Sequence, residues 1–229
     1  MILRKLSTVA ALAGSLLLAP IAQAGIISVT DSVFDSVDNA FGTKNLSFAA
    51  GDFTGSSIIT GLTLTIDFSK CGSGVDSTGC TGGSGTPFAN EIGFGLRSPF
   101  GTTISLIENN SDNETFETGN FDTFVVGTSN LSRIVTTFSD MGAALGTLPA
   151  SGTFAPEGSL AAFNGESGIG DWTFFYEDDV GSDPLGIHSV TLNLNTRSGP
   201  ITNTVPEPGT LAIFALGLAG LGFSRRKRA

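Results

Sequence analysis

Residues 163–195 read FNGESGIGDWTFFYEDDVGSDPLGIHSVTLNLN and contain the single Trp, the single Tyr and the single His of the chain. Large apolar side chains occupy every second position in residues 172–176 and again in 190–194. A period of two is typical of strands that bury one face. Gly181 and Pro184 interrupt the pattern between the two segments, as a connection between strands requires. The stretch therefore predicts two strands of a β-sandwich.

The rest of the mature region continues this pattern. Glycine is abundant, with 31 residues, and only 14% of residues are charged, a composition that suits many short strands joined by tight turns. We expect an all-β, jelly-roll-like sandwich of about eight or nine strands and no helix in the mature region. Residues 25–50 are expected to supply one edge strand, and residues 141–158 a long surface connection. The other expected strands are 57–68, 92–96, 104–106, 121–126 and 131–138.

Two motifs resemble the P domain that follows the catalytic domain in subtilisin-like proprotein convertases. Residues 95–102, GLRSPFGT, are similar to a conserved turn of that family. Residues 165–194 are similar to its closing motif, although Val190 stands where the family usually has a second Trp. The resemblance covers roughly residues 60–195 and implies a jelly-roll β-sandwich. It does not imply proteolytic activity for this chain.

Residues 1–24 have the features of a secretory signal peptide. Arg4 and Lys5 precede an apolar run, and Ala22, Gln23 and Ala24 form an A-x-A cleavage site for signal peptidase. The mature chain is expected to begin at Gly25. The alternative, an N-terminal membrane anchor, requires an apolar run of about 20 residues, which is longer than the one present.

The last 25 residues (205–229) contain, in order, a VPEP motif, an apolar run and a basic end. Val205, Pro206, Glu207 and Pro208 precede the apolar residues 209–223 and the cluster RRKR at 225–228. This arrangement resembles the PEP-CTERM sorting signal of Gram-negative bacteria that make an extracellular polysaccharide matrix. The resemblance implies a C-terminal apolar sorting helix, transient anchoring in the inner membrane and processing by an exosortase-type enzyme. A permanent membrane helix is the alternative.

The domain between the two signals, residues 25–204, is strongly acidic. It contains 5 Lys or Arg residues and 20 Asp or Glu residues, a formal charge of −15. Such a surface repels nucleic acid and anionic lipid. It favours divalent cations or basic partners, although solubility alone also explains it.

Cys71 and Cys80 enclose a Gly/Ser-rich loop. In an exported chain with two cysteines, a disulfide is the expected state. A redox or metal pair is the alternative, but the spacing is not CxxC and too few further ligands are present for zinc.

The acidic residues between the two strands are candidate calcium ligands. Calcium prefers oxygen ligands, and Glu177, Asp178, Asp179 and Asp183 lie close together in the sequence. The alternative is a solvated acidic loop. A turn in the chain is needed to bring these carboxylates together.

No catalytic motif stands out, so we expect no enzymatic activity. His188 is expected to be a surface residue of a strand, and no G-x-S-x-G motif accompanies it. A glycosidase needs only two carboxylates, so glycosidase activity is an alternative that the sequence does not exclude. Trp172 is expected in the core rather than as a sugar-stacking platform.

Together these features predict an exported structural or adhesive protein of the cell envelope, surface or biofilm matrix. A calcium-dependent module that binds extracellular polysaccharide is the alternative. An accessory domain for a separately encoded secreted protease is a third hypothesis, which rests on the P-domain resemblance.

Overall fold

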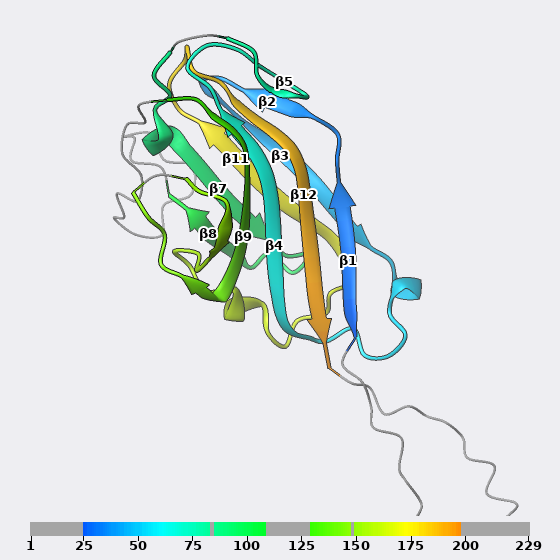
Figure 1. The fold of residues 1–229 in the computed structure, drawn as a ribbon. Helices are drawn as coiled ribbons and strands as arrows, with labels where there is room; N and C mark the ends of the chain where they lie inside the picture. The colour runs from blue at the N-terminus through cyan, green and yellow to red at the C-terminus, as the bar shows by residue number, and fades with distance from the viewer. Residues whose placement is uncertain (1–24, 83–84, 109–128, 148, 198–229) are drawn as a thin grey trace, which may run out of the picture. The chain divides into compact units, whose positions relative to one another are not determined.

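β-strands form nearly all of the regular structure in the computed structural model, which describes residues 25–82, 85–108, 129–147 and 149–197 (Figure 1). One sheet has six strands, in the order β1-β12-β4-β9-β10, and β2 also pairs with β12. Its members are β1 (Ile26–Asp31), β2 (Asp35–Val37), β4 (Ile59–Lys70), β9 (Leu131–Ala143), β10 (Gly152–Phe154) and β12 (Leu185–Thr196).

The second sheet has four strands in the order β3-β11-β7-β8. These are β3 (Ala40–Phe48), β7 (Ile92–Arg97), β8 (Thr103–Ile107) and β11 (Gly170–Asp178). A small hairpin of β5 (Val75–Asp76) and β6 (Gly79–Cys80) and three short 3₁₀ helices, η1 (Ala50–Asp52), η2 (Ala89–Glu91) and η3 (Leu160–Phe163), complete the described elements.

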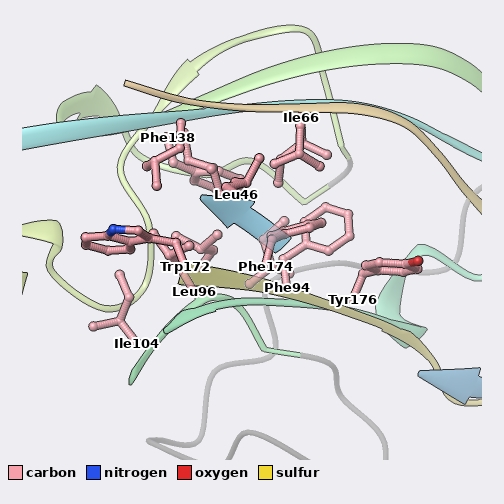
Figure 2. Close-up of a cluster of buried hydrophobic side chains, with 14 of the residues drawn as sticks. Leu46, Ile66, Phe94, Leu96, Ile104, Phe138, Trp172, Phe174 and Tyr176 are labelled. Carbon is pink, nitrogen blue, oxygen red and sulfur yellow. The ribbon is translucent and has the colours of Figure 1, made fainter. Parts of the chain in front are cut away.

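The core lies between the two sheets, where their inward side chains meet. Figure 2 shows Ile66 and Phe138 from the six-stranded sheet above Phe94, Trp172 and Phe174 from the four-stranded one. All five side chains are fully buried. The rings of Phe94 and Phe174 lie 5.5 Å apart, and aromatic pairs at such distances add to the stabilisation from burial. The prediction of an all-β sandwich is confirmed.

The described residues form twelve strands instead of the expected eight or nine, and β5 and β6 lie in the loop expected between the two cysteines. Residues 25–50 form three strands (β1, β2 and β3) instead of one edge strand. β9 continues past Phe138 to Ala143, and β10 lies within the predicted surface connection. The end of β9 is mostly exposed, and the Ala155 N–H donates to the Ala143 carbonyl at 2.7 Å. Backbone pairing rather than apolar alternation holds this part of the strand, so the sequence pattern does not reveal it.

Some predictions fall outside the described residues. They are the signal peptide up to Ala24, the strand at 121–126, and the sorting segment 205–229 with its apolar helix. Among the residues that the structure describes, none forms a helix with the length and hydropathy that a membrane span requires.

Candidate functional site

Lys70 is the last residue of β4, and its side chain faces the interior. Leu62, Leu64, Ile66 and Phe68 alternate on the inward face of this strand, and Lys70 continues the series. Its side chain is 0% exposed. A lysine is almost never fully buried unless it is paired, so the interior must supply a counter-charge.

Asp178 supplies that charge from the opposite sheet. It ends β11 and continues the inward series of Trp172, Phe174 and Tyr176. The ammonium Nζ of Lys70 lies 2.5 Å from Asp178 Oδ1, and both side chains are 0% exposed. The second carboxylate oxygen, Oδ2, accepts a hydrogen bond from the Leu185 N–H at 3.1 Å. The pair thus joins the two sheets at one end of the core.

Two further acidic residues complete the cluster around Lys70. Glu91, at the end of η2, places Oε2 at 3.3 Å from Nζ, and Asp183 places Oδ2 at 3.0 Å. The Asp183 carbonyl oxygen also accepts a hydrogen bond from Nζ, at 2.6 Å. We call Lys70, Glu91, Asp178 and Asp183 the buried charge cluster.

The loop between β11 and β12 is held in an unusual conformation to reach this cluster. Ser182 has a φ of +102°, a conformation that L-residues rarely adopt and that typically costs about 1–3 kcal/mol. Its N–H donates to Asp38 Oδ1 at 2.8 Å, and the Phe88 N–H donates to Asp183 Oδ2 at 2.5 Å. These bonds, with the contacts to Lys70, fix the loop and its carboxylate.

Burial dominates the electrostatics of the cluster. It raises the pKa of Asp178 to about 8 and the pKa of Glu91 to about 7, although the Lys70 ammonium opposes both shifts. Three carboxyl groups share one cation, and their mutual repulsion adds to the effect of burial. The site therefore favours extra protons over three full negative charges.

The structure brings together two of the four residues predicted to bind calcium. Asp178 and Asp183 meet in the cluster. Glu177 points to the other face of β11, where a Cβ added at Gly93 would collide with its side chain, and Asp179 is half-buried beyond the strand end. Sequence reasoning missed Lys70 and Glu91. The sequence did contain a signal for Lys70. The inward-facing apolar residues of β4 end at this cation, and those of β11 end at the anion Asp178.

Glu91, Asp178 and Asp183 could hold a cation, since their oxygens lie within 4.8 Å of one another. The Lys70 ammonium already lies among these oxygens. A calcium ion would have to displace it, which weighs against the calcium site predicted from the sequence. That site stays a prediction.

Three other predictions are decided by the structure. Cys71 and Cys80 form a disulfide, as expected. Trp172 is fully buried, and its Nε1–H donates to the Gly168 carbonyl at 3.1 Å, which confirms its place in the core. The surface position predicted for His188 is wrong. It is 5% exposed, its Nε2 lies 2.8 Å from Ser69 Oγ, and its ring lies 5.3 Å from that of Phe34.

The reason for the His188 error is a break in the strand pattern. The register between β12 and β4 shifts between Ile187 and Ser189, so that four consecutive residues, 185–188, are buried. Strict alternation does not predict such a bulge. Burial lowers the pKa of His188 and so favours the neutral form of its ring.

Comparison with known protein families gives a match at the C-terminal end. Residues 204–227 match the family described as the PEP-CTERM protein-sorting motif. The chain carries a PEP-CTERM sorting signal. This motif implies export and processing by an exosortase-type system, as the VPEP motif at 205–208 predicted. The P-domain resemblance is not confirmed and stays a prediction.

Other comparisons add little. No curated protein matches the chain. Similar solved structures include a mutant VP2 protein of infectious bursal disease virus (14% identity, TM-score 0.21, 94% of this chain and 52% of that one) and the virus of the Gt strain (13% identity, TM-score 0.20, 89% and 51%). The chain spans about half the length of these proteins, and likenesses this low support no inference.

Proposed function

We propose that the protein is a non-catalytic β-sandwich that an exosortase-type system delivers to the cell envelope, surface or extracellular matrix, where it has a structural or adhesive role. The proposal rests on the PEP-CTERM motif, which follows the β-sandwich domain in the sequence. Signal peptidase and the exosortase-type enzyme are its processing partners, and the inner membrane holds it only transiently.

The buried charge cluster supports a structural rather than a catalytic role. Its four residues are between 0% and 6% exposed, so no dissolved substrate reaches them. The Ser69–His188 pair is similarly enclosed, at 0% and 5%. These polar groups hold the sandwich together instead of presenting chemistry at its surface.

Binding of extracellular polysaccharide is a weaker proposal for the same domain. Aromatic side chains that stack on sugars must be exposed, and the burial of Trp172 removes the candidate that the sequence offered. The proposed role as accessory to a secreted protease rests on the P-domain resemblance alone.

Fractionation of the native host tests the proposal. An antibody against the mature domain should find the wild-type protein in the surface or matrix fraction, and its intact mass should correspond to a chain from Gly25 to a residue near 206–208. Replacement of Pro206, Glu207 and Pro208 by alanine should retain the protein, with its tail, in the inner membrane.

A matched control replaces Ile201, Thr202 and Asn203 by alanine, just before the region that matches the motif, and should leave sorting unchanged. Recovery of wild-type protein from the matrix with Phe223 and Arg228 still attached would contradict processing. Equal distribution of wild-type and motif variant would contradict sorting.

A further inference from the structure

Lys70 and Asp178 place an amine and a carboxyl group in contact inside the sandwich, one on each sheet. We propose that these two side chains form an intramolecular amide bond without an external enzyme, with Glu91 as the proton carrier. The bond would join the end of β4 covalently to the end of β11. It is a modification of the folded protein that goes beyond the proposed function and does not depend on it.

The geometry selects Asp178 among the three acidic neighbours of Lys70. Its Oδ1 lies closest to Nζ, at 2.5 Å, against 3.0 Å for Asp183 and 3.3 Å for Glu91. Asp178 is also the one acid of the three whose side chain is 0% exposed. Because it ends a central strand paired with both β3 and β7, its backbone is fixed.

Burial prepares the pair for reaction. In a low-dielectric interior an ion pair and the neutral pair that results from proton transfer approach each other in free energy. Proton transfer from Nζ to Oδ1 needs no movement of heavy atoms, since the two atoms are already hydrogen-bonded. The product is a neutral amine, which is a nucleophile, next to a neutral carboxylic acid, which is an electrophile.

The carboxyl group already has a partner for the charge that would develop on it. Attack of Nζ on Cγ of Asp178 forms the C–N bond and moves an electron pair onto Oδ2. The Leu185 N–H, 3.1 Å from Oδ2, would stabilise that negative charge as an oxyanion-hole donor does.

Glu91 closes the proton balance. Its Oε2 lies 3.3 Å from Nζ, within reach of the proton that nitrogen must lose after attack. Glu91 takes this proton and returns it to the Oδ1 hydroxyl. The C–Oδ1 bond breaks, water leaves, and the C=Oδ2 bond re-forms. One amine and one acid yield one amide and one water, with no oxidant or other reactant.

Asp183 holds the amine in place. Its carbonyl oxygen accepts a hydrogen bond from Nζ, its carboxylate forms an ion pair with Nζ at 3.0 Å, and the Phe88 N–H fixes the carboxylate. Lys70 thus has little freedom to turn away from Asp178. Because the two groups are held in contact, the reaction between them is much faster than it would be between the same groups free in solution.

The mass of the exported, processed protein tests the proposal without any variant. After reduction and unfolding, the measured mass of the wild-type protein should be lower, by one water molecule, than the mass calculated from the sequence of the processed chain. Trypsin cleaves after free lysines, so it should leave the chain uncut after Lys70. Fragmentation should then identify one branched peptide that joins Lys70 to Asp178. A full sequence mass, or a branch at Glu91 or Asp183, would overturn the proposal.

Variants separate the chemistry from folding. Lys70→Arg keeps the positive charge but removes the amine, and Asp178→Ala removes the electrophile, so both proteins should have their full sequence masses. Glu91→Gln preserves size and should slow or abolish water loss. A fully linked Glu91→Gln protein would overturn the role assigned to Glu91.

Lys44→Arg is the matched control. Lys44 is also a buried lysine, with Nζ 3.2 Å from Asp31 Oδ1, but Asp31 is 25% exposed and offers no enclosed acid. This variant should lose one water molecule as the wild type does. Retention of the full sequence mass in Lys44→Arg would show that the loss does not arise at Lys70.

Discussion

Trp172 contributes the largest fully buried side chain of the core. Its ring packs edge-on against Phe163 at 5.1 Å, and Figure 2 shows it beside Leu96 and Ile104. We predict that Trp172→Ala lowers the free energy of unfolding by about 3–5 kcal/mol, the usual cost of deleting a large aromatic side chain from a core. Urea denaturation measures this value.

The exposed Phe100 provides the control for that measurement. Its side chain is 65% exposed, so Phe100→Ala should change stability by less than about 0.5 kcal/mol. If Trp172→Ala has an equally small effect, the ring does not hold the core together.

Glu157 makes stability depend on pH. Burial raises its pKa from 4.5 to about 7, and the nearby Glu108 carboxylate adds to the shift, although the Glu108 N–H donates to Glu157 Oε2 at 2.6 Å. Between these two pKa values the folded state binds more protons than the unfolded state. The free energy of unfolding therefore falls as the pH rises through this range.

Glu157→Gln should remove this dependence and keep the carbonyl acceptor for the Glu108 N–H. We predict that the stability of the variant relative to wild type increases as the pH rises from about 5 to 8, measured by chemical denaturation at each pH. A constant difference across this range would show that Glu157 titrates normally.

At the scale of elements, the disulfide holds the β5–β6 hairpin against the end of β4. Cys71 directly follows Lys70, and the bond closes a loop of sequence separation 9. The double variant Cys71→Ser and Cys80→Ser should lose about 2.5–3 kcal/mol in the chain-entropy account of small loops. Thermal unfolding of oxidised and reduced wild type gives an independent measurement, and unchanged midpoints in both experiments would contradict this account.

The structure changes the prediction that the loop between β11 and β12 binds calcium. Because Lys70 Nζ lies among the side-chain oxygens of Glu91, Asp178 and Asp183, with or without the amide bond, it fills the space that a calcium ion would need. We therefore predict equal melting midpoints for the wild type in millimolar calcium and in chelator. Lys70→Met leaves three acids without their counter-ion, so calcium should raise the midpoint of this variant more than magnesium does. A calcium-dependent rise of the wild-type melting midpoint would support the original hypothesis that this acidic loop binds calcium.

The sequence was informative where apolar and polar residues alternate clearly along a strand, but not in residues 25–50, where the alternation is weak. Alternation located β4, β7, β11 and β12 and placed Trp172 in the core. It failed where other forces hold the chain: at the exposed end of β9, at the β12 bulge that buries His188, and in the buried charge cluster. The cluster joins residues from four separate segments, and single-strand periodicity contains no information on which ends will face each other.

At the scale of the whole molecule, β12, the last strand of the described residues, holds the six-stranded sheet together. β12 pairs with β1 on one side and with β4 on the other, and β2 pairs with its first residues (Figure 1). We predict that a chain truncated after residue 184 does not fold, whereas one truncated after residue 197 unfolds as cooperatively as the full chain. Circular dichroism and urea titration distinguish the two, and a folded shorter chain would contradict this role of β12.

The central place of β12 also bears on how the chain crosses the membrane. An exported polypeptide emerges N-terminus first, and β1 then waits for a partner more than a hundred residues behind it. Pairings this distant in sequence form slowly. The six-stranded sheet cannot be completed until β12 has emerged, so the chain can stay extended enough for translocation almost to its end. Only the sorting tail then remains to be delivered, and folding and release from the channel would nearly coincide.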